Sequence, residues 1–298
     1  MDLKRYLQEK KELVDLALEE YLPKKEETPA SLYEAMRYSL FAGGKRIRPI
    51  LSMAAFDAVG GRGNEILPFA CALEMIHAYS LIHDDLPAID NDDFRRGKLT
   101  SHKVFGEAIA ILAGDALLTE AFHVMADQLN RKDQWYDPGL ILDLVNEVAR
   151  AAGVLGMVGG QVVDVESEGK EVDVPTVEYI HSHKTGAMIQ VSIRAGARLG
   201  GARGESLTAL TRYGESVGLA FQVTDDILNV EGKAELLGKS IGSDLAKRKA
   251  TYPSVLGVEE SKRRARELVE RAVGALSSFG EEADPLREIA RFIVAREH

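Results

Sequence analysis

Cysteine, tryptophan and long apolar runs are scarce in this sequence. Its 298 residues include one Cys and one Trp. A single cysteine excludes an internal disulfide and fits a reducing compartment. Because Cys71 lies in an apolar stretch, we interpret it as a core side chain rather than a nucleophile. No segment reaches the roughly 20 consecutive apolar residues of a spanning helix, and the first residues lack the apolar region of a signal peptide. We therefore expect no membrane span and a cytoplasmic protein.

Basic charge is also in short supply. Lys and Arg number 37 against 47 Asp and Glu, which gives a formal net charge of −10. Binding to nucleic acid by counterion release needs a basic surface, so we expect no nucleic-acid partner. The apolar content of 45% and the charged content of 28% are typical of a globular protein with a sizeable core.

Alternating strand patterns are missing, and apolar residues recur at the helical period along nearly the whole chain. We expect helices over residues 47–59, 64–87, 102–128, 138–152, 174–183 and 205–231. No linker is long enough to divide the chain. The sequence therefore predicts an all-α fold with a single domain over residues 1–298, a large helical bundle with its site in the core.

Two acidic clusters in apolar surroundings are present, over residues 83–90 and 222–229. Carboxylates placed against a core repel each other and lose hydration unless a cation meets them. Two such clusters indicate one shared cation cluster. Their donors are oxygen atoms, with no His or Cys at metal-ligand spacing, which favours Mg²⁺ over zinc. The alternative for either cluster is a solvated acidic turn.

The second cluster has the regular spacing of one helix face. Gln222, Asp225 and Asn229 are separated by three and four residues and so lie on the same face. Asp226 is rotated from them by about 100° and need not join them. This spacing predicts that Asp225 faces the site.

The first cluster cannot share one face of a regular helix. Asp84 and Asp90 are six residues apart, about 240° around the axis, so the helix must deform or end between them. Pro87 provides a reason for it to do so. Arg95 and Arg96 follow soon after, and guanidinium groups beside metal ligands suit a polyphosphate. The alternative is that these arginines pair with Asp92 and Asp93.

A third segment, residues 43–49, combines two glycines with three cations in four residues. Glycines let the backbone turn closely, and the cations Lys45, Arg46 and Arg48 present an anion site. The spacing is not that of a phosphate-binding Walker loop. His77 lies seven residues before Asp84, on nearly the same helix face. A lone histidine there is more often structural, but facing a phosphate it can donate a hydrogen bond.

These segments, in this order, resemble the trans-isoprenyl diphosphate synthases of the short-chain bacterial type. The resemblance covers nearly the whole chain. It is carried by residues 43–49, 74–90, 95–98, 104–107, 160–161, 184–186, 221–229 and 249–253. It implies an all-α bundle around a deep apolar cavity, usually a homodimer. It also implies a prenyltransferase that joins isopentenyl diphosphate to an allylic diphosphate such as dimethylallyl or geranyl diphosphate.

The resemblance further implies roles for individual residues. A cluster of Mg²⁺ ions, for which Mn²⁺ can substitute, would be bound by Asp84, Asp90 and Asp225. The allylic diphosphate would be held by Arg95, Lys184, Thr185, Gln222 and Lys239. Isopentenyl diphosphate would be held by Lys45, Arg48, His77 and Arg96. The catalytic set would be Asp84, Asp85, Asp90, Arg95, Lys184 and Asp225.

A mechanism follows from the charges in such a site. Cations stabilise the departing diphosphate, so the allylic C–O bond ionises. The double bond of isopentenyl diphosphate, held in its own anion site, attacks the carbocation, and a proton is then lost. No protein nucleophile is needed, which agrees with the lack of a Ser-His-Asp or Cys-His pattern in the sequence.

In this family the residue five positions before the first aspartate influences the product length. Here that residue is Tyr79, followed by Ser80. A bulky ring closes the floor of the cavity, so the resemblance implies a farnesyl (C15) product. Geranylgeranyl diphosphate synthase is the alternative within the family, and an ordinary core tyrosine is the alternative for Tyr79.

One position departs from the family pattern. The second cluster ends in Asn229 where aspartate is usual. An amide oxygen can bind Mg²⁺ or a metal-bound water but brings no charge. We expect activity to survive because Asp225 keeps the inward-facing position.

Two readings from other classes remain open. A terpene cyclase also ionises allylic diphosphates, but it has no need for a second anion site. A non-catalytic subunit of a synthase is expected to lose the first aspartates, which this chain retains.

Overall fold

The computed structural model describes residues 1–130, 136–231 and 249–295. The chain divides into two compact units. The first unit comprises Lys4–Ile50 and Asn64–Val145, and the second comprises Met1–Leu3, Leu51–Gly63 and Asn146–His298. The first aspartate cluster lies in the first unit and the second cluster in the second unit. The all-α prediction is confirmed, since helices account for nearly all regular structure in the described ranges.

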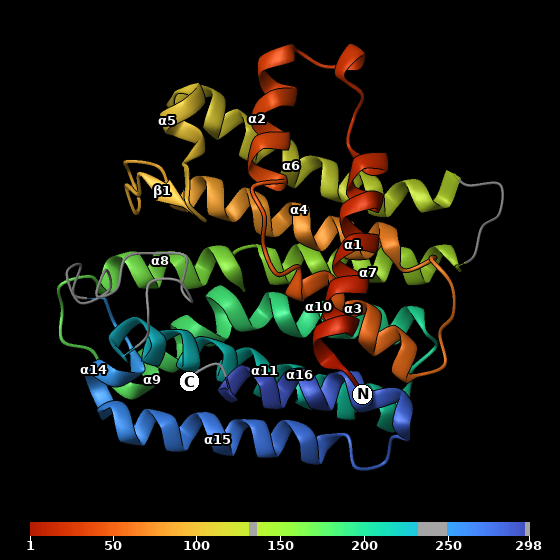
Figure 1. The fold of residues 1–298 in the computed structure, drawn as a ribbon, viewed down its shortest axis with the longest axis vertical. Coiled ribbons are helices and arrows are strands. Elements are labelled where there is room, and N and C mark those ends of the chain that lie inside the picture. The colour runs from red at the N-terminus through yellow and green to blue at the C-terminus, as the bar shows by residue number, and fades with distance from the viewer. Residues whose placement is uncertain (131–135, 232–248, 296–298) are drawn as a thin grey trace. The chain divides into compact units, whose positions relative to one another are not determined.

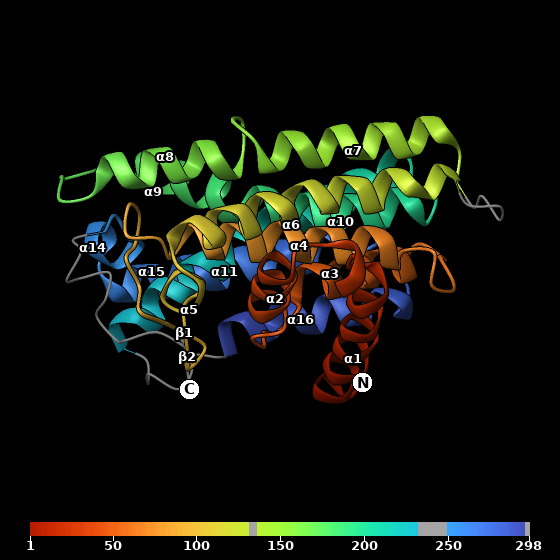
Figure 2. The ribbon, with the colours of Figure 1, turned by 90° about the horizontal axis from the view of Figure 1, so that it is seen from above.

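The first unit is built around a buried helix, α4 (Leu67–Asp84). Thirteen of its 18 residues are buried, so it has no polar face of its own. Helix α6 (Glu107–Asp127) runs antiparallel along it, and the two remain side by side in both views (Figures 1 and 2). The other elements of this unit are α1 (Leu3–Tyr21), η1 (Lys25–Glu27), α2 (Ala30–Leu40), α5 (Ser101–Phe105), η2 (Gln128–Asn130) and the start of α7 (Pro138–Ala152).

A short β-ribbon that the sequence did not predict joins α4 to α5. Strand β1 (Phe94–Arg95) pairs antiparallel with β2 (Lys98–Leu99). The two residues of the connecting turn, Arg96 and Gly97, have φ angles of 53° and 76°. Positive φ at both turn residues matches the right-handed twist of a two-residue hairpin. A non-glycine residue held in this conformation is strained, which marks Arg96 as a position of interest.

The second unit contains a run of antiparallel helices. Helix α11 (Gly204–Glu231) packs against α10 (Ala187–Leu199) on one side and α15 (Val258–Ala275) on another (Figure 1). A six-residue π-helix, η3 (His181–Gly186), precedes α10 and packs against α8 and α11. The remaining elements are α8 (Met157–Ser167), α9 (Val174–Ile180), α14 (Tyr252–Leu256), η4 (Glu281–Ala283) and α16 (Asp284–Ala295), and α3 (Ile47–Ala58) contributes residues to both units.

Three expected helices have different ends or interruptions. The segment predicted over 64–87 ends at Asp84, three residues before Pro87. The segment over 102–128 breaks at Gly106, whose φ of 84° ends α5 and begins α6. The segment over 174–183 passes from α-helix into π-helix at His181. The first and third differences occur beside candidate site residues, at Asp84 and just before Lys184.

One stretch, Glu107–Asn130, is long and apolar enough to cross a membrane by length and composition alone. It consists of α6 and the short turn η2. Helix α6 packs against α4 and α2 within the first unit, and 39% of the most apolar window is buried there. Core helices of globular proteins meet the same criterion.

Candidate active site

The end of α4 brings the two outer aspartates of the first cluster together. The Asp90 amide donates a hydrogen bond of 2.8 Å to the Asp84 carbonyl, so residues six apart in sequence have adjacent backbones. The Asn91 amide donates to the Leu86 carbonyl at 3.0 Å, and Asn91 has a φ of 51°. This turn is the deformation that the spacing of Asp84 and Asp90 required. Asp90 is buried and Asp84 is half-buried.

The middle aspartate of this cluster, Asp85, is directed at an arginine. Arg95 donates from Nε to both carboxylate oxygens at 2.9 and 2.8 Å, and from Nη2 at 2.5 Å. Burial alone lowers the pKa of Arg95, but the hydrogen bonds and charge of Asp85 outweigh it and raise the pKa overall. The alternative pairing with Asp92 and Asp93 is borne out only in part. Asp92 forms a longer ion pair of 3.9 Å with Arg95, whereas Asp93 pairs with Lys103.

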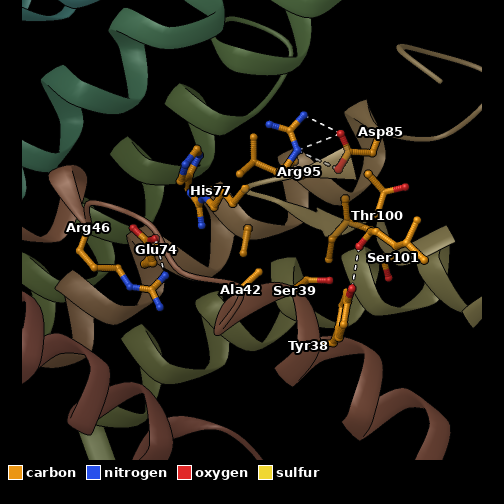
Figure 3. A pocket seen from close by; sticks show the side chains of 15 residues that line it. Tyr38, Ser39, Ala42, Arg46, Glu74, His77, Asp85, Arg95, Thr100 and Ser101 are labelled. Carbon is orange, nitrogen blue, oxygen red and sulfur yellow. Dashed lines mark hydrogen bonds and ion pairs between the residues drawn. The ribbon is translucent and has the colours of Figure 1, made fainter. Parts of the chain in front are cut away.

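A small cavity lies beside α4 in the first unit (Figure 3). Its volume is about 30 Å³, enough for water. The Arg46–Glu74 pair and the Arg95–Asp85 pair lie on different sides of it. The residues that line it are Tyr38, Ser39, Ala42, Arg46, Glu74, His77, Ala78, Leu81, Ile82, Asp85, Arg95, Arg96, Leu99, Thr100 and Ser101.

The interpretation of residues 45–48 as three anion-binding cations is wrong for Arg46. Its side chain is 2% exposed and donates to Asp15 at 2.8 Å, to Glu74 at 2.7 Å and to the Leu40 carbonyl at 2.8 Å. The φ of Arg46 is 51°. Arg46 therefore has a structural role, because its hydrogen bonds hold the loop against α1, α2 and α4. Lys45 remains exposed.

The loop packs closely against Arg96, and Gly44 makes room for its guanidinium. The Arg96 guanidinium donates to the Gly43 carbonyl. A β-carbon on Gly44 would lie 2.6 Å from Arg96 Nη1. With φ angles of 98° and 132°, both loop positions adopt a conformation that glycine tolerates best. The structure thus brings Arg96 to the loop that carries Lys45 and Arg48, as the isopentenyl diphosphate assignment requires.

His77 lies on the cavity wall in a strongly cationic setting. Desolvation lowers its pKa well below the usual value, and the charges of Arg48, Arg96, Arg95 and Arg46 lower it further. The imidazole is therefore neutral near pH 7. A neutral ring donates from one nitrogen only and adds no charge to the site.

Tyr79 lies on α4 and is 7% exposed. Its ring meets the His83 ring edge-on, with centroids 5.3 Å apart and an interplanar angle of 89°. His83 Nε2 lies 3.0 Å from the Ile111 carbonyl of α6. Ser80 donates from Oγ to the His77 carbonyl at 2.9 Å, within its own helix. Tyr79 is therefore held in place by a neighbouring ring, whereas the hydroxyl of Ser80 bonds to its own helix backbone.

The second cluster occupies the C-terminal part of α11. Asp225 is half-buried, whereas Asp226 and Asn229 are buried. Gln222, Asp225 and Asn229 lie in one continuous helix, as their spacing predicted, and the Gln222 amide also donates to Asp226 Oδ1 at 3.3 Å. Gln222 Oε1 in turn accepts from the Thr185 hydroxyl at 2.8 Å. The structure thus brings Thr185 and Gln222 together, as expected.

Glycines of two neighbouring helices pack closely against the π-helix that contains Lys184 and Thr185. A β-carbon on Gly160 of α8 would lie 2.3 Å from the Lys184 amide nitrogen, and one on Gly218 of α11 would lie 2.9 Å from the Gly186 Cα. Lys184 donates to Asp164 at 2.6 Å. π-Helical turns recur at functional sites because they re-aim side chains.

Two further lysines belong to segments that the sequence singles out. Lys249, to which the resemblance assigns no role, lies 4.0 Å from Asp164 Oδ2. Lys239, expected at the allylic diphosphate, lies outside the described residues. Sequence reasoning missed Asp164, His181 and Tyr252. The change from α-helix to π-helix at residue 181 has no simple periodic signal, so the sequence offered none for His181.

The donor chemistry of the aspartates fits Mg²⁺. Asp84, Asp90 and Asp225 offer only oxygen atoms, and the turn after α4 places two of these positions side by side. Over residues 1–130, 136–231 and 249–295, no group of three or more His, Cys, Asp or Glu side chains is clustered tightly enough to hold a metal alone. Mg²⁺ commonly binds through one or two carboxylates, with water and substrate phosphate completing the octahedron.

Comparison with known proteins decides the family. The family model described as polyprenyl synthetase matches residues 29–289. The chain belongs to the polyprenyl synthetase family. It is 48% identical to a geranylgeranyl diphosphate synthase from Cyanophora paradoxa, over 99% of this chain and 97% of that one. It is 47% identical to a farnesyl diphosphate synthase from Geobacillus stearothermophilus, over 100% and 99% of the two chains.

The fold agrees with this family. A crystal structure of an FPP/GFPP synthase from Zymomonas mobilis aligns with a TM-score of 0.86 at 39% identity, covering 98% of this chain and 99% of that one. The expectation of a trans-isoprenyl diphosphate synthase is confirmed, and the protein is a prenyltransferase. Both the farnesyl and the geranylgeranyl reading fall within this family.

Proposed function

We propose that this polyprenyl synthetase makes farnesyl diphosphate by Mg²⁺-dependent condensation of isopentenyl diphosphate with dimethylallyl and then geranyl diphosphate. The burial of Tyr79 is the observation that supports the proposed length of the product. Its ring is buried on α4 and meets the His83 ring, five residues before Asp84 at the end of the same helix. Relatives at 47–48% identity are named for different products, so overall similarity does not choose the length.

The allylic diphosphate is assigned to the aspartates and to Arg95, Lys184, Thr185, Gln222 and Lys239. Asp84, Asp90 and Asp225 would hold Mg²⁺, which neutralises the charge that develops on the leaving diphosphate. Arg95 and Lys184 add positive charge, and Thr185 and Gln222 add hydrogen bonds. The C–O bond breaks with its electron pair leaving on the diphosphate, and Asp85 supports this step by holding Arg95.

Isopentenyl diphosphate is assigned to Lys45, Arg48, Arg96 and His77. The neutral His77 ring donates one hydrogen bond, and the guanidinium groups provide the charge. Held there, the double bond of isopentenyl diphosphate supplies the electron pair for the new C–C bond. A proton then leaves the adjacent carbon to the released diphosphate. The substrates therefore supply both the nucleophile and the base, and the chain supplies neither.

We also propose that this single-domain enzyme is a cytoplasmic homodimer. Helix α6 exposes the apolar side chains Ile111 and Leu112, which are 42% and 53% accessible. An exposed apolar face on an otherwise packed helix fits a second copy of the chain. The same pairing accounts for the apolar composition of α6 without a bilayer.

The proposal is tested by incubating the protein with Mg²⁺, isopentenyl diphosphate and, in turn, dimethylallyl, geranyl or farnesyl diphosphate, followed by product sizing. We expect C15 from the first two starters and little extension of the third. Efficient extension to C20 would replace the farnesyl assignment with the geranylgeranyl one. Geranyl diphosphate alone is the control, because a terpene cyclase consumes it whereas an elongating synthase does not.

A further inference from the structure

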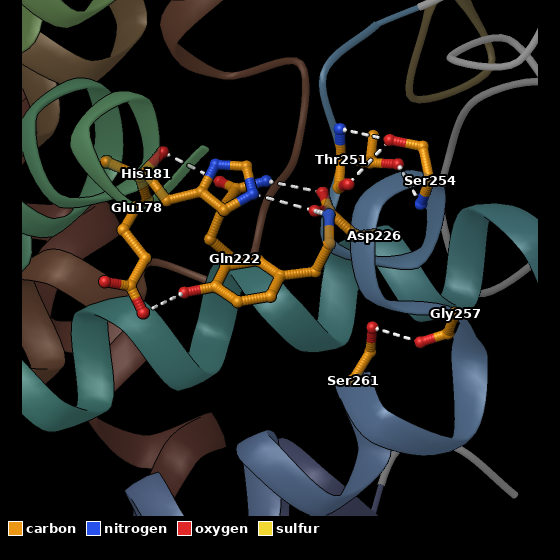
Figure 4. Close-up of polar contacts among 10 residues, drawn as sticks. Glu178, His181, Gln222, Asp226, Thr251, Ser254, Gly257 and Ser261 are labelled. Carbon is orange, nitrogen blue, oxygen red and sulfur yellow. Dashed lines mark hydrogen bonds and ion pairs between the residues drawn. The ribbon is translucent and has the colours of Figure 1, made fainter. Parts of the chain in front are cut away.

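In each aspartate pair the second carboxylate is buried and tied to a segment that carries diphosphate-binding groups. Asp85 is fastened to Arg95 of the β-ribbon. Asp226 is 3% exposed, and its Oδ2 atom lies 2.7 Å from His181 Nε2 (Figure 4). Because an ionised carboxylate only accepts, His181 donates from Nε2 in this pair.

His181 is the first residue of the π-helix. It is 5% exposed, and its ring stacks on the Tyr252 ring with centroids 5.4 Å apart at 26°. Lys184 and Thr185 follow three and four residues later in the same element. The hydrogen bond to Asp226 therefore holds the start of the segment that presents both side chains.

The other oxygen of Asp226 leads to the same segment by a second route. Gln222 donates to Oδ1 at 3.3 Å and accepts from the Thr185 hydroxyl at 2.8 Å. The two oxygens of one carboxylate thus hold the two ends of the π-helix, one directly through His181 and one through Gln222. π-Helices are rare and occur mostly as single turns within α-helices.

A third segment is fastened at the same point. The Tyr252 amide donates to Asp226 Oδ2 at 2.9 Å, at the start of α14. Lys249, three residues earlier, reaches to within 4.0 Å of the Asp164 carboxylate that also binds Lys184. Asp226 therefore connects α11, the π-helix and the Lys249 segment, and all of these contacts lie within the second unit.

We propose that Asp226 and His181 are positioning residues for the allylic diphosphate. They fix the π-helix so that Lys184 and Thr185 meet the substrate, while Asp226 does not bind Mg²⁺ itself. This inference rests on the proposed function. It gives two adjacent carboxylates different roles. Asp225 would bind Mg²⁺, and Asp226 would hold the π-helix in place.

The test uses substitutions that remove one property at a time. His181→Phe keeps a ring to stack on Tyr252 but cannot donate, whereas His181→Gln restores a donor. Asp226→Asn removes the charge at nearly constant size, and Asp225→Asn serves as the comparison for metal binding. His183→Phe is the matched control, since His183 belongs to the same π-helix but stacks on Tyr179 instead.

We expect His181→Phe and Asp226→Asn to raise the KM for geranyl diphosphate by roughly tenfold, the scale of a lost hydrogen bond to a charged group. The KM for isopentenyl diphosphate and the half-saturating Mg²⁺ concentration should stay unchanged. His181→Gln should recover much of the loss, and His183→Phe should behave as the unsubstituted protein does. Asp225→Asn should raise the Mg²⁺ requirement. An equal rise for Asp226→Asn, or an unchanged KM in His181→Phe, would overturn the proposal.

Amide hydrogen exchange gives a readout that needs no activity. Exchange in the peptide spanning residues 181–186 should accelerate in His181→Phe and Asp226→Asn but not in His183→Phe. Unchanged protection of this peptide in His181→Phe and Asp226→Asn would show that the contact between the two residues does not hold the π-helix. If the unsubstituted protein does not elongate geranyl diphosphate, the proposed function fails, and the exchange result still decides whether Asp226 holds the π-helix.

Discussion

The His83 ring lies against Gly114 so closely that a β-carbon at residue 114 would be 2.2 Å from His83 Nε2. This contact joins α4 to α6 one residue before Asp84, and the other edge of the His83 ring meets Tyr79. The absence of a side chain at Gly114 therefore sets the position of His83, and through it that of Tyr79.

We predict that Gly114→Ala destabilises the protein by about 1–3 kcal/mol, the usual cost of overpacking. The added methyl group must displace His83 from α6. Urea denaturation measures the change in the free energy of unfolding. The matched control is Gly274→Ala in α15, where a β-carbon meets nothing within 4 Å, so alanine should be neutral or slightly stabilising. Equal effects of the two substitutions would contradict this contact.

Tyr79→Ala should lengthen the product. If Tyr79 limits the product as proposed, removing its buried ring gives a longer prenyl chain room to extend. Product sizing with geranyl diphosphate as the starter should show C20 or longer chains where the unsubstituted enzyme gives C15. Tyr33→Ala, which removes a tyrosine that contacts Arg37 on α2, is the control and should leave the length unchanged. Unaltered C15 output from Tyr79→Ala would remove the basis for the farnesyl assignment.

Arg46→Met should cost about 3–5 kcal/mol of stability, because it leaves the buried Glu74 carboxylate without its cation. Glu74 is 3% exposed in its side chain and would keep an uncompensated charge. The double variant Arg46→Met with Glu74→Gln should recover part of that loss. Chemical denaturation of the two variants checks both statements, and a loss below about 1 kcal/mol for Arg46→Met would show that the pair is dispensable.

Lowering the pH should destabilise the fold through His77. Its folded-state pKa lies below the unfolded value of about 6.5, so the unfolded chain binds the proton more readily. The stability of the neutral state is fully present above that pH and is lost as the pH falls through 6.5 toward the folded pKa. The free energy of unfolding should fall by at most about 1.4 kcal/mol per pH unit through this one group. Denaturation between pH 7 and 5 should show that His77→Gln loses less stability than the unsubstituted protein as the pH falls. Parallel plots of stability against pH for the two proteins would refute the lowered pKa of His77.

The helical fold could be predicted because its signal is periodic and long. The core face of α4 is visible as a nearly continuous apolar run, and its end was expected near Pro87. The β-ribbon could not be predicted, since two-residue strands have no period and depend on the positive φ of Arg96 and Gly97. Local pattern does not reveal a turn stabilised by tertiary contacts.

The candidate site was predicted where charge spacing was sufficient and missed where partners lie far apart in sequence. The turn between Asp84 and Asp90 was predicted because residues six apart cannot share one face of a regular helix. Arg46 was misassigned because its partner Glu74 lies 28 residues away, and no spacing links the two. The bond between His181 and Asp226 spans 45 residues. Such contacts appear only once the helices are packed.

The ion pair between Lys184 and Asp164 has a consequence for turnover. At 2.6 Å the ammonium already has a carboxylate partner, so under the proposed assignment an arriving diphosphate would exchange with Asp164 rather than meet a bare cation. The net gain is then the difference between two similar attractions, which keeps ground-state affinity modest. Under the same assignment, the carboxylate would compete again for the lysine after each condensation, and the lengthened product would be released more readily than from a permanently open anion site.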